Sequence, residues 1–196
     1  FSCEKSMELM RDHFKPGISE QELWSRFQME AVSRGAEWIE TRLLASGPRA
    51  NPWYQECSSR PILTGELMGF DTDLVGSYGY CTDMSRTWLC GDEKPTDEQK
   101  EIYTMGYEQI QNNMKLLKPG VTFKELTLNA KEYSKQEFRH YSVLFHGVGL
   151  CDEFPAIPFS WELNENSFDG VLQPGMVLCV ETYVGRFIGG PGVKLE

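Results

Sequence analysis

The chain has 196 residues, 40% of them hydrophobic, which is typical of one folded domain with a sizeable core. Its net charge of −10 disfavours a nucleic-acid partner, and no apolar run approaches the roughly 20 residues of a membrane span. The six cysteines include no C-x-x-C pair, which argues against a zinc knuckle or a thioredoxin motif and favours free thiols in the cytoplasm.

Helix signals dominate the start of the chain. Ser19 is a good N-cap, because Glu22 three residues later can complete a capping box. The elements expected in this half, in chain order, are a helix over 2–14, a helix from Ser19 to Gly35, a strand over 38–45 and a loop over 46–57.

The stretch from Gly69 to Trp88 carries three aspartates on what reads as a β-hairpin. Asp71 and Asp73 are two residues apart, so their side chains share a face of one strand. Asp83 lies on the second strand and would meet them across the ladder. Three converging carboxylates repel each other unless a cation or basic groups neutralise them. The ordinary alternative is a hairpin whose acids face solvent.

The second part of the chain repeats this order of elements. We expect a capped helix from Thr96 to Lys118, a helix over about 122–138, a strand over 143–150 with His146, a polar loop over 159–174 and a strand over 175–184 with Glu181.

An internal repeat connects the two parts. Lys15-Pro16-Gly17-Ile18-Ser19 matches Lys118-Pro119-Gly120-Val121-Thr122, and the run leading to Asp71 resembles the run leading to Glu181. Chance agreement between two Pro-Gly helix ends is the alternative. The repeat predicts one domain over 1–196 with half-repeats of about 1–92 and 96–196, related by a pseudo-twofold axis. We expect the chain to be a C-terminal fragment, since it begins at Phe1 and ends at Glu196 within an unfinished strand.

A pseudo-twofold fold would bring the acids of both halves to one central site. The candidate ligands are carboxylates and one imidazole: Asp71 or Asp73 or both, Asp83, Glu181, Glu196 and His146. So many anions suit two divalent ions with bridging carboxylates, and oxygen-rich ligands with one nitrogen favour Mn or Fe over a structural zinc. For His146, a core histidine without a metal is the alternative.

These residues in this order, with His146-Gly-Val-Gly149, resemble the pita-bread metalloenzymes, which include methionine aminopeptidase, aminopeptidase P, prolidase and creatinase. The resemblance covers nearly the whole chain. It implies an α+β pita-bread fold, duplicated around a curved antiparallel sheet, two divalent ions and a homodimer. It also implies that Arg86 contacts a metal-binding carboxylate without binding the metal itself; a surface salt bridge is the alternative.

The chain departs from the peptidases of that fold at their two further histidines. Asp152-Glu153 follows the metal histidine where peptidases carry His-Glu, and the loop before the hairpin reads Trp53-Tyr54. In these respects the chain is similar to the pita-bread lyases that cleave dimethylsulfoniopropionate into dimethyl sulfide and acrylate. That likeness implies Asp152 as general base, with a turn-capping role as its alternative.

The same likeness implies a small zwitterionic sulfonium substrate and an iron centre, with Mn or Zn also compatible. Tyr141 and Trp53 would hold the sulfonium by cation–π attraction, with Tyr54 as a weaker candidate; packing is the alternative for these rings. Two other functions stay open. One is a hydrolase like Xaa-Pro dipeptidase, aminopeptidase P or creatinase, and the other is a metal-free binding module of the same fold.

Overall fold

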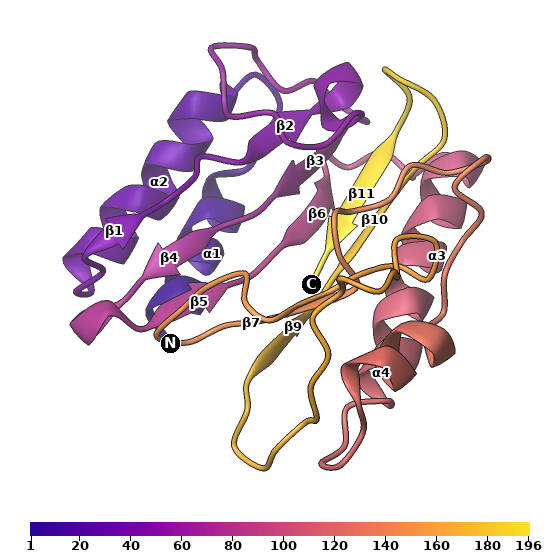
Figure 1. Ribbon diagram of the computed structural model, residues 1–196. Coiled ribbons are helices and arrows are strands. Elements are labelled where there is room, and N and C mark those ends of the chain that lie inside the picture. The colour runs from indigo at the N-terminus through magenta and orange to yellow at the C-terminus, as the bar shows by residue number, and fades with distance from the viewer.

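The computed structural model describes residues 1–196, in which helices cover a set of antiparallel strands (Figure 1). The helices are α1 (Ser2–His13), α2 (Glu20–Ser33), α3 (Asp97–Met114) and α4 (Phe123–Asn129), with 3-10 turns at Gly47–Ala50 and Ser77–Gly79. The strands are β1 (Trp38–Ile39), β2 (Leu44–Ser46), β3 (Leu67–Phe70), β4 (Asp73–Val75), β5 (Cys81–Asp83), β6 (Arg86–Leu89), β7 (Phe145–Gly147), β8 (Ala156–Ile157), β9 (Leu178–Val180), β10 (Thr182–Gly185) and β11 (Gly192–Leu195). None of the helices has the length and apolar character needed to span a bilayer.

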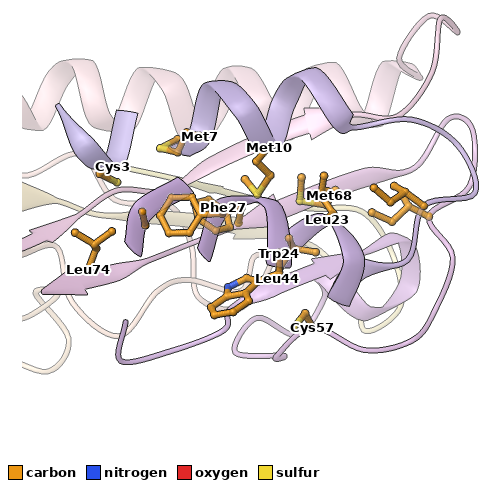
Figure 2. Packing of buried hydrophobic residues seen from close by; sticks show 14 of the residues in the cluster. Cys3, Met7, Met10, Leu23, Trp24, Phe27, Leu44, Cys57, Met68 and Leu74 are labelled. Carbon is orange, nitrogen blue, oxygen red and sulfur yellow. The ribbon is translucent and has the colours of Figure 1, made fainter. Parts of the chain in front are cut away.

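Helices α1 and α2 pack against the sheet of order β2-β3-β6 and form the first core (Figure 2). Phe27 of α2 meets Phe70 of β3 with ring centroids 4.9 Å apart. The Ser19 side chain accepts from the Glu22 backbone N–H as expected, but the reciprocal bond of a capping box is absent. Instead, the first N–H groups of α2, at Glu20 and Gln21, donate to backbone carbonyls of the loop that follows β2.

The acidic hairpin is interrupted on both of its strands. Asp73 and Asp83 face each other directly in the β4–β5 pair, which confirms the expected cross-ladder contact. Asp71 and Thr72 separate β3 from β4, and Met84 and Ser85 separate β5 from β6. The expected strand over 38–45 is divided in the same way, because β1 pairs with β4 and β2 pairs with β3.

Helices α3 and α4 pack on the second core with β7 to β11. The expected helix over 122–138 ends at Asn129. Beyond it, the backbone of Lys131 forms hydrogen bonds with the side chains of Gln109 and Asn113 of α3 instead of continuing the helix. The expected long helix ends at Met114 rather than Lys118.

Two predicted strands of the second half are shorter than expected. The strand over 143–150 is reduced to β7, and the strand over 175–184 is divided at Glu181 into β9 and β10. The division arises because β9 pairs with β7 whereas β10 pairs with β11.

The second helix of each half begins in the same way. Gly17 and Gly120 have φ of 89° and 91°, and their N–H groups donate to Ile62 and Leu172 at 2.8 Å. Isolated bridges join Ser19 to Pro61 and Thr122 to Val171. These matching turns explain why the Lys-Pro-Gly motif occurs twice.

Candidate metal centre

Strand ends supply most of the acids of the site. Asp71 follows β3, Asp83 ends β5, Glu181 separates β9 from β10, and Glu196 follows β11. Each acid therefore sits where a strand changes partners or stops, and the sheets bring these points together. The side chains of Asp71, Asp83 and Glu181 are buried, as is that of His146.

Asp83 lies at the middle of the cluster. Three groups of donor atoms each converge within 4.8 Å: Asp83 with His146 and Cys179, Asp83 with Asp71 and Glu196, and Asp83 with Asp73 and Glu153. Asp83 Oδ2 also lies 3.3 Å from His146 Nε2. An acid shared by three donor groups has the position of a bridging carboxylate.

Glu181 belongs to none of these three groups, although it lies close to them. Its Oε1 is 3.2 Å from His146 Nε2, and its Oε2 accepts a hydrogen bond from Lys194 Nζ at 2.5 Å. Glu181 therefore approaches the same His146 nitrogen that Asp83 approaches, and its role as a ligand stays a prediction.

Lys194 is a member of the site that the sequence analysis missed. Its side chain is fully buried, and Nζ lies 2.5 Å from Ser85 Oγ and 3.4 Å from Asp71 Oδ2. The available signal was a lysine in the apolar run Gly192–Leu195, where a charge has no place unless it is paired. Lys194 alone cannot balance the carboxylates of Asp71, Asp73, Asp83, Glu181 and Glu196, so additional positive charge would stabilise the cluster.

The two aspartates of the Asp71-Thr-Asp73 run are held differently. Asp71 Oδ1 accepts from Ser85 Oγ at 2.6 Å and from the Thr72 N–H at 3.1 Å. Asp73 Oδ2 accepts from Thr41 Oγ1 at 2.7 Å. Both aspartates approach Asp83, so the structure keeps each of them as a candidate ligand.

Burial sets the protonation of the acids. It raises the pKa of Asp73 to about 6 and that of Glu196 to about 8, and it raises the pKa of Asp83 strongly. Burial alone would lower the pKa of His146, but Asp83 and Glu181 raise it to about 12. Burial and the neighbouring carboxylates outweigh the single ammonium of Lys194, so the pKa values of Asp83 and Glu196 stay raised.

Two buried carboxylate oxygens have no hydrogen-bond donor: Asp83 Oδ1 and Asp152 Oδ2. Buried acceptors without a donor are rare, and an ion is one explanation for them. The unpaired Asp83 oxygen and the carboxylate-rich donors around it fit divalent cations. The acids, His146 and Cys179 would hold them.

Asp152 lies at the edge of this cluster. Its Oδ1 is 3.7 Å from His146 Nδ1 and also accepts the Glu153 N–H at 3.0 Å. The turn-capping contact that was its alternative is therefore present, but it occupies one oxygen only. The side chain is 9% exposed, and the other oxygen is the unpaired one noted above.

Glu153, next to Asp152, is an acid to which the sequence had given no role. It joins Asp73 and Asp83 in one donor group, and burial raises the pKa of its carboxyl. It lies in an irregular loop, where no periodic pattern of the sequence indicates which way a side chain points.

Arg86 contacts main-chain atoms of the site. Its Nη1 donates to the carbonyl oxygens of Ser85 and Glu196, at 2.7 and 2.8 Å. It therefore holds Glu196 through the backbone carbonyl, because β6 begins beside the end of β11. It forms no salt bridge, which was its alternative.

Trp53 and Tyr141 share one small aromatic cluster with Leu43 and Tyr183. Both side chains are buried, and Lys194 Nζ lies 4.3 Å from the centroid of the Tyr141 ring. Tyr54, which is 52% exposed, stacks on Tyr141 at 5.5 Å. Tyr54 therefore presents the accessible ring of this cluster.

No second imidazole reaches the site. His13 bonds to the Leu9 carbonyl within α1, and His140 packs against Phe159 and Trp161. His146 is thus the one histidine among the acids.

The comparisons with known proteins agree with this geometry. Metallopeptidase family M24 matches residues 2–196. The dimethylsulfoniopropionate lyase DddP of Roseovarius nubinhibens is 46% identical over 202 residues, and that of Roseobacter denitrificans is 45% identical over 203. Each alignment covers 100% of this chain and 45% of the relative, so the chain spans about half the length of these curated relatives.

Solved structures show the same fold. The Xaa-Pro dipeptidase of Bacillus anthracis superposes with a TM-score of 0.81 at 29% identity, over 98% of this chain and 53% of the other. The prolidase of Pyrococcus furiosus gives 0.83 at 27% identity, over 99% and 57%. The chain therefore belongs to metallopeptidase family M24 and has the α+β pita-bread fold of that family.

Proposed function

We propose that the protein is a metal-dependent lyase that converts dimethylsulfoniopropionate into dimethyl sulfide and acrylate, with Asp152 as the general base. The observation that carries the proposal is the unpaired, buried oxygen of Asp152 beside a carboxylate cluster that contains a single histidine. The substrate comes from the names of two relatives at 45 and 46% identity.

β-Elimination fits the groups that the site holds. Asp152 Oδ2 takes the proton from the carbon next to the substrate carboxylate, and the electron pair of that C–H bond forms the new double bond. The C–S bond breaks, and its electrons leave with sulfur as neutral dimethyl sulfide. Because a sulfonium leaves without protonation, no general acid is required, and the lack of a second histidine is no obstacle.

Two divalent ions would bind the substrate carboxylate and stabilise the negative charge that develops beside it. We assign them to the side chains of Asp71, Asp73, Asp83, His146, Glu181 and Glu196. Iron is favoured by the carboxylate-rich set with one imidazole, and Mn or Zn remain compatible.

The aromatic cluster is assigned to the sulfonium end of the substrate. Trp53 and Tyr141 form its buried base and Tyr54 its exposed ring. Attraction between a cation and such rings contributes about 0.5–2 kcal/mol. Lys194 already faces Tyr141, so the sulfonium meets the other rings of the cluster.

A hydrolase acting on Xaa-Pro dipeptides is the second candidate, because the superposed structures include an Xaa-Pro dipeptidase. The single histidine disfavours it. A metal-free binding module is the third, and the unpaired Asp83 oxygen disfavours that one. A homodimer and a cytoplasmic location stay predictions from the resemblance and the cysteine pattern.

The test measures dimethyl sulfide by headspace gas chromatography after metal-loaded whole protein is mixed with dimethylsulfoniopropionate. We expect Asp152→Asn to reduce the rate by about 10²–10⁴-fold with its bound metal unchanged. Asp92→Asn, at an exposed acid outside the site, is the matched control.

A parallel assay with an Xaa-Pro dipeptide separates the candidates. Proline release without dimethyl sulfide would identify a hydrolase. Silence in both assays with two ions bound would retain the metal centre and reject the substrate, and silence without bound ions would favour the binding module.

A further inference from the structure

Glu20 begins helix α2, and its fully buried carboxylate accepts hydrogen bonds from three residues that lie far along the chain. Its Oε1 accepts from the backbone N–H and from Oγ of Ser46, at 2.9 and 2.8 Å. Its Oε2 accepts from the backbone N–H and from Oγ of Ser58, at 3.0 and 2.7 Å, and from Nη1 of Arg49. A buried carboxylate is stable only with such donors, so these bonds hold all three residues firmly in place.

The donors stand at both ends of one loop. Ser46 is the last residue of strand β2, and Ser58 follows the loop of residues 47–57. Arg49 lies within the loop, and its Nη2 donates to the carbonyl oxygen of Glu56 at 2.8 Å. One carboxylate therefore joins the two ends of the loop and, through the guanidinium, its interior.

The loop carries two rings that the proposed function places around the sulfonium. Trp53 stacks on Tyr183 with ring centroids 6.0 Å apart, and Tyr54 stacks on Tyr141 at 5.5 Å. Residues 51–55 belong to no helix or strand, and Tyr54 has a φ of 73°, which residues other than glycine rarely adopt. The surrounding structure has to hold the backbone in this conformation, and the anchored ends of the loop contribute to that.

We propose that Glu20 is a positioning residue that holds Trp53 and Tyr54 where they bind the sulfonium end of the substrate. The inference rests on the proposed function, because it needs a cationic substrate at these rings. Glu20 itself is 0% exposed and touches no substrate, so it acts through the hydrogen bonds at the ends of the loop. Asp152 and the metal-binding acids lie outside this loop, so substrate binding depends on Glu20 more than the chemical step does.

Glu20→Gln is the main test, because it keeps the size of the side chain and changes its hydrogen bonding. An amide has one acceptor oxygen, and whichever way it is turned its NH₂ group faces donors on the other side. The backbone N–H of Ser46 or of Ser58 then loses its acceptor, and one end of the loop is released. We expect the KM for dimethylsulfoniopropionate to rise about 2–30-fold, the range that cation–π attraction spans, with kcat changed by less than about 2-fold.

Glu22→Gln is the matched control, since Glu22 lies in the same first turn of α2 but is exposed, and its KM should stay at the wild-type value. A double-variant cycle with Tyr54→Leu shows whether Glu20 acts through the loop. In the Tyr54→Leu background, Glu20→Gln should raise KM by a smaller factor. Ser58→Ala removes a single hydroxyl donor and covers the case in which Glu20→Gln fails to fold; its KM should rise as well.

Hydrogen exchange followed by mass spectrometry gives a readout that needs no activity. In the metal-loaded whole protein, Glu20→Gln should speed exchange in residues 46–58 and leave the strands of Asp83 and His146 unchanged.

Faster exchange in the loop with an unchanged KM would overturn the role of Glu20 in substrate binding, and unchanged exchange would show that Glu20 does not hold the loop. A fall in kcat as large as the rise in KM, with faster exchange throughout the protein, would leave Glu20 a role in general stability alone. In each of these cases the wild-type protein still makes dimethyl sulfide, and the proposed function stands. A wild-type protein that makes none overturns the proposed function, and this inference with it.

Discussion

Lys194 Nζ lies 2.5 Å from Glu181 Oε2, and both side chains are fully buried. The fold therefore supplies one permanent cation to a cluster of five carboxylates. The same ammonium reaches Asp71 Oδ2 at 3.4 Å, so it links acids from both halves of the chain. Burial opposes the charge on Lys194, but the nearby carboxylates of Asp71 and Glu181 outweigh it and raise the pKa of the ammonium well above its usual value.

Replacing this lysine tests whether the cluster needs its own cation. We expect Lys194→Met to lower the free energy of unfolding by about 3–5 kcal/mol, because removal of one partner leaves a buried charge uncompensated. Urea unfolding of the metal-free protein measures the loss. Lys115→Met, at an exposed lysine, should change stability by less than about 0.5 kcal/mol. Equal effects of the two substitutions would show that the acids are neutral without Lys194.

The metal-free protein should lose stability as the pH rises from about 4 to 8. Unfolded Asp and Glu release their protons near pH 4, whereas folded Asp73 and Glu196 hold theirs to about pH 6 and 8. The folded state therefore binds more protons in this window, and stability falls with rising pH. His146, with its pKa raised to about 12, acts in the same direction above about pH 6.5.

Melting temperatures in a chelator at several pH values measure this dependence. Asp73→Asn should flatten the decline between about pH 4 and 6. Excess manganese should reverse the trend, because deprotonated ligands bind the ion and its stabilising effect grows with pH. A chelated protein whose melting temperature rises through this window would contradict the assigned burial of the acids.

Gly69 tests the position of Trp53 behind the site. A Cβ atom at Gly69 would lie 2.7 Å from the Trp53 ring, closer than side chains tolerate. We expect Gly69→Ala to displace the indole, quench or shift tryptophan fluorescence and destabilise the protein by about 1–3 kcal/mol. Gly106→Ala in α3 is the control, because its Cβ would make ordinary contacts at 3.4–3.5 Å and alanine favours a helix. Similar behaviour of both variants would place Trp53 elsewhere.

Local signals in the sequence predicted the helices well. Ser19, Thr96 and Thr122 accept the expected N-terminal hydrogen bonds, and Thr96 forms a full capping box with Gln99. Such caps are decided by residues three positions apart, which a sequence displays directly. The early end of α4 was missed because it depends on Asn113 and Gln109, which come from another helix.

The acids of the site were predictable because their order along the chain is a motif, whereas their partners were not. Lys194 lies two residues before Glu196, and Cys179 lies two residues before Glu181. Because side chains two residues apart on a strand share a face, each of them is placed near the site. That placement has meaning only once the register of β7 with β9 and of β10 with β11 is known. The breaks in the acidic hairpin depend on strand exchange between sheets, which periodicity alone does not reveal.

Single substitutions among the aspartates should separate the two ions. Asp83 belongs to all three donor groups, whereas Asp71 and Asp73 belong to one group each. We expect Asp83→Asn to lose both ions, and Asp71→Asn and Asp73→Asn to retain about one ion per chain, because a bridging ligand serves both positions. Metal analysis after dialysis measures the ratio, and circular dichroism confirms the fold of each variant. Asp169→Asn, at an exposed loop acid, should keep the wild-type ratio. An Asp83→Asn protein that still binds two ions would show that Asp83 does not serve both ion positions.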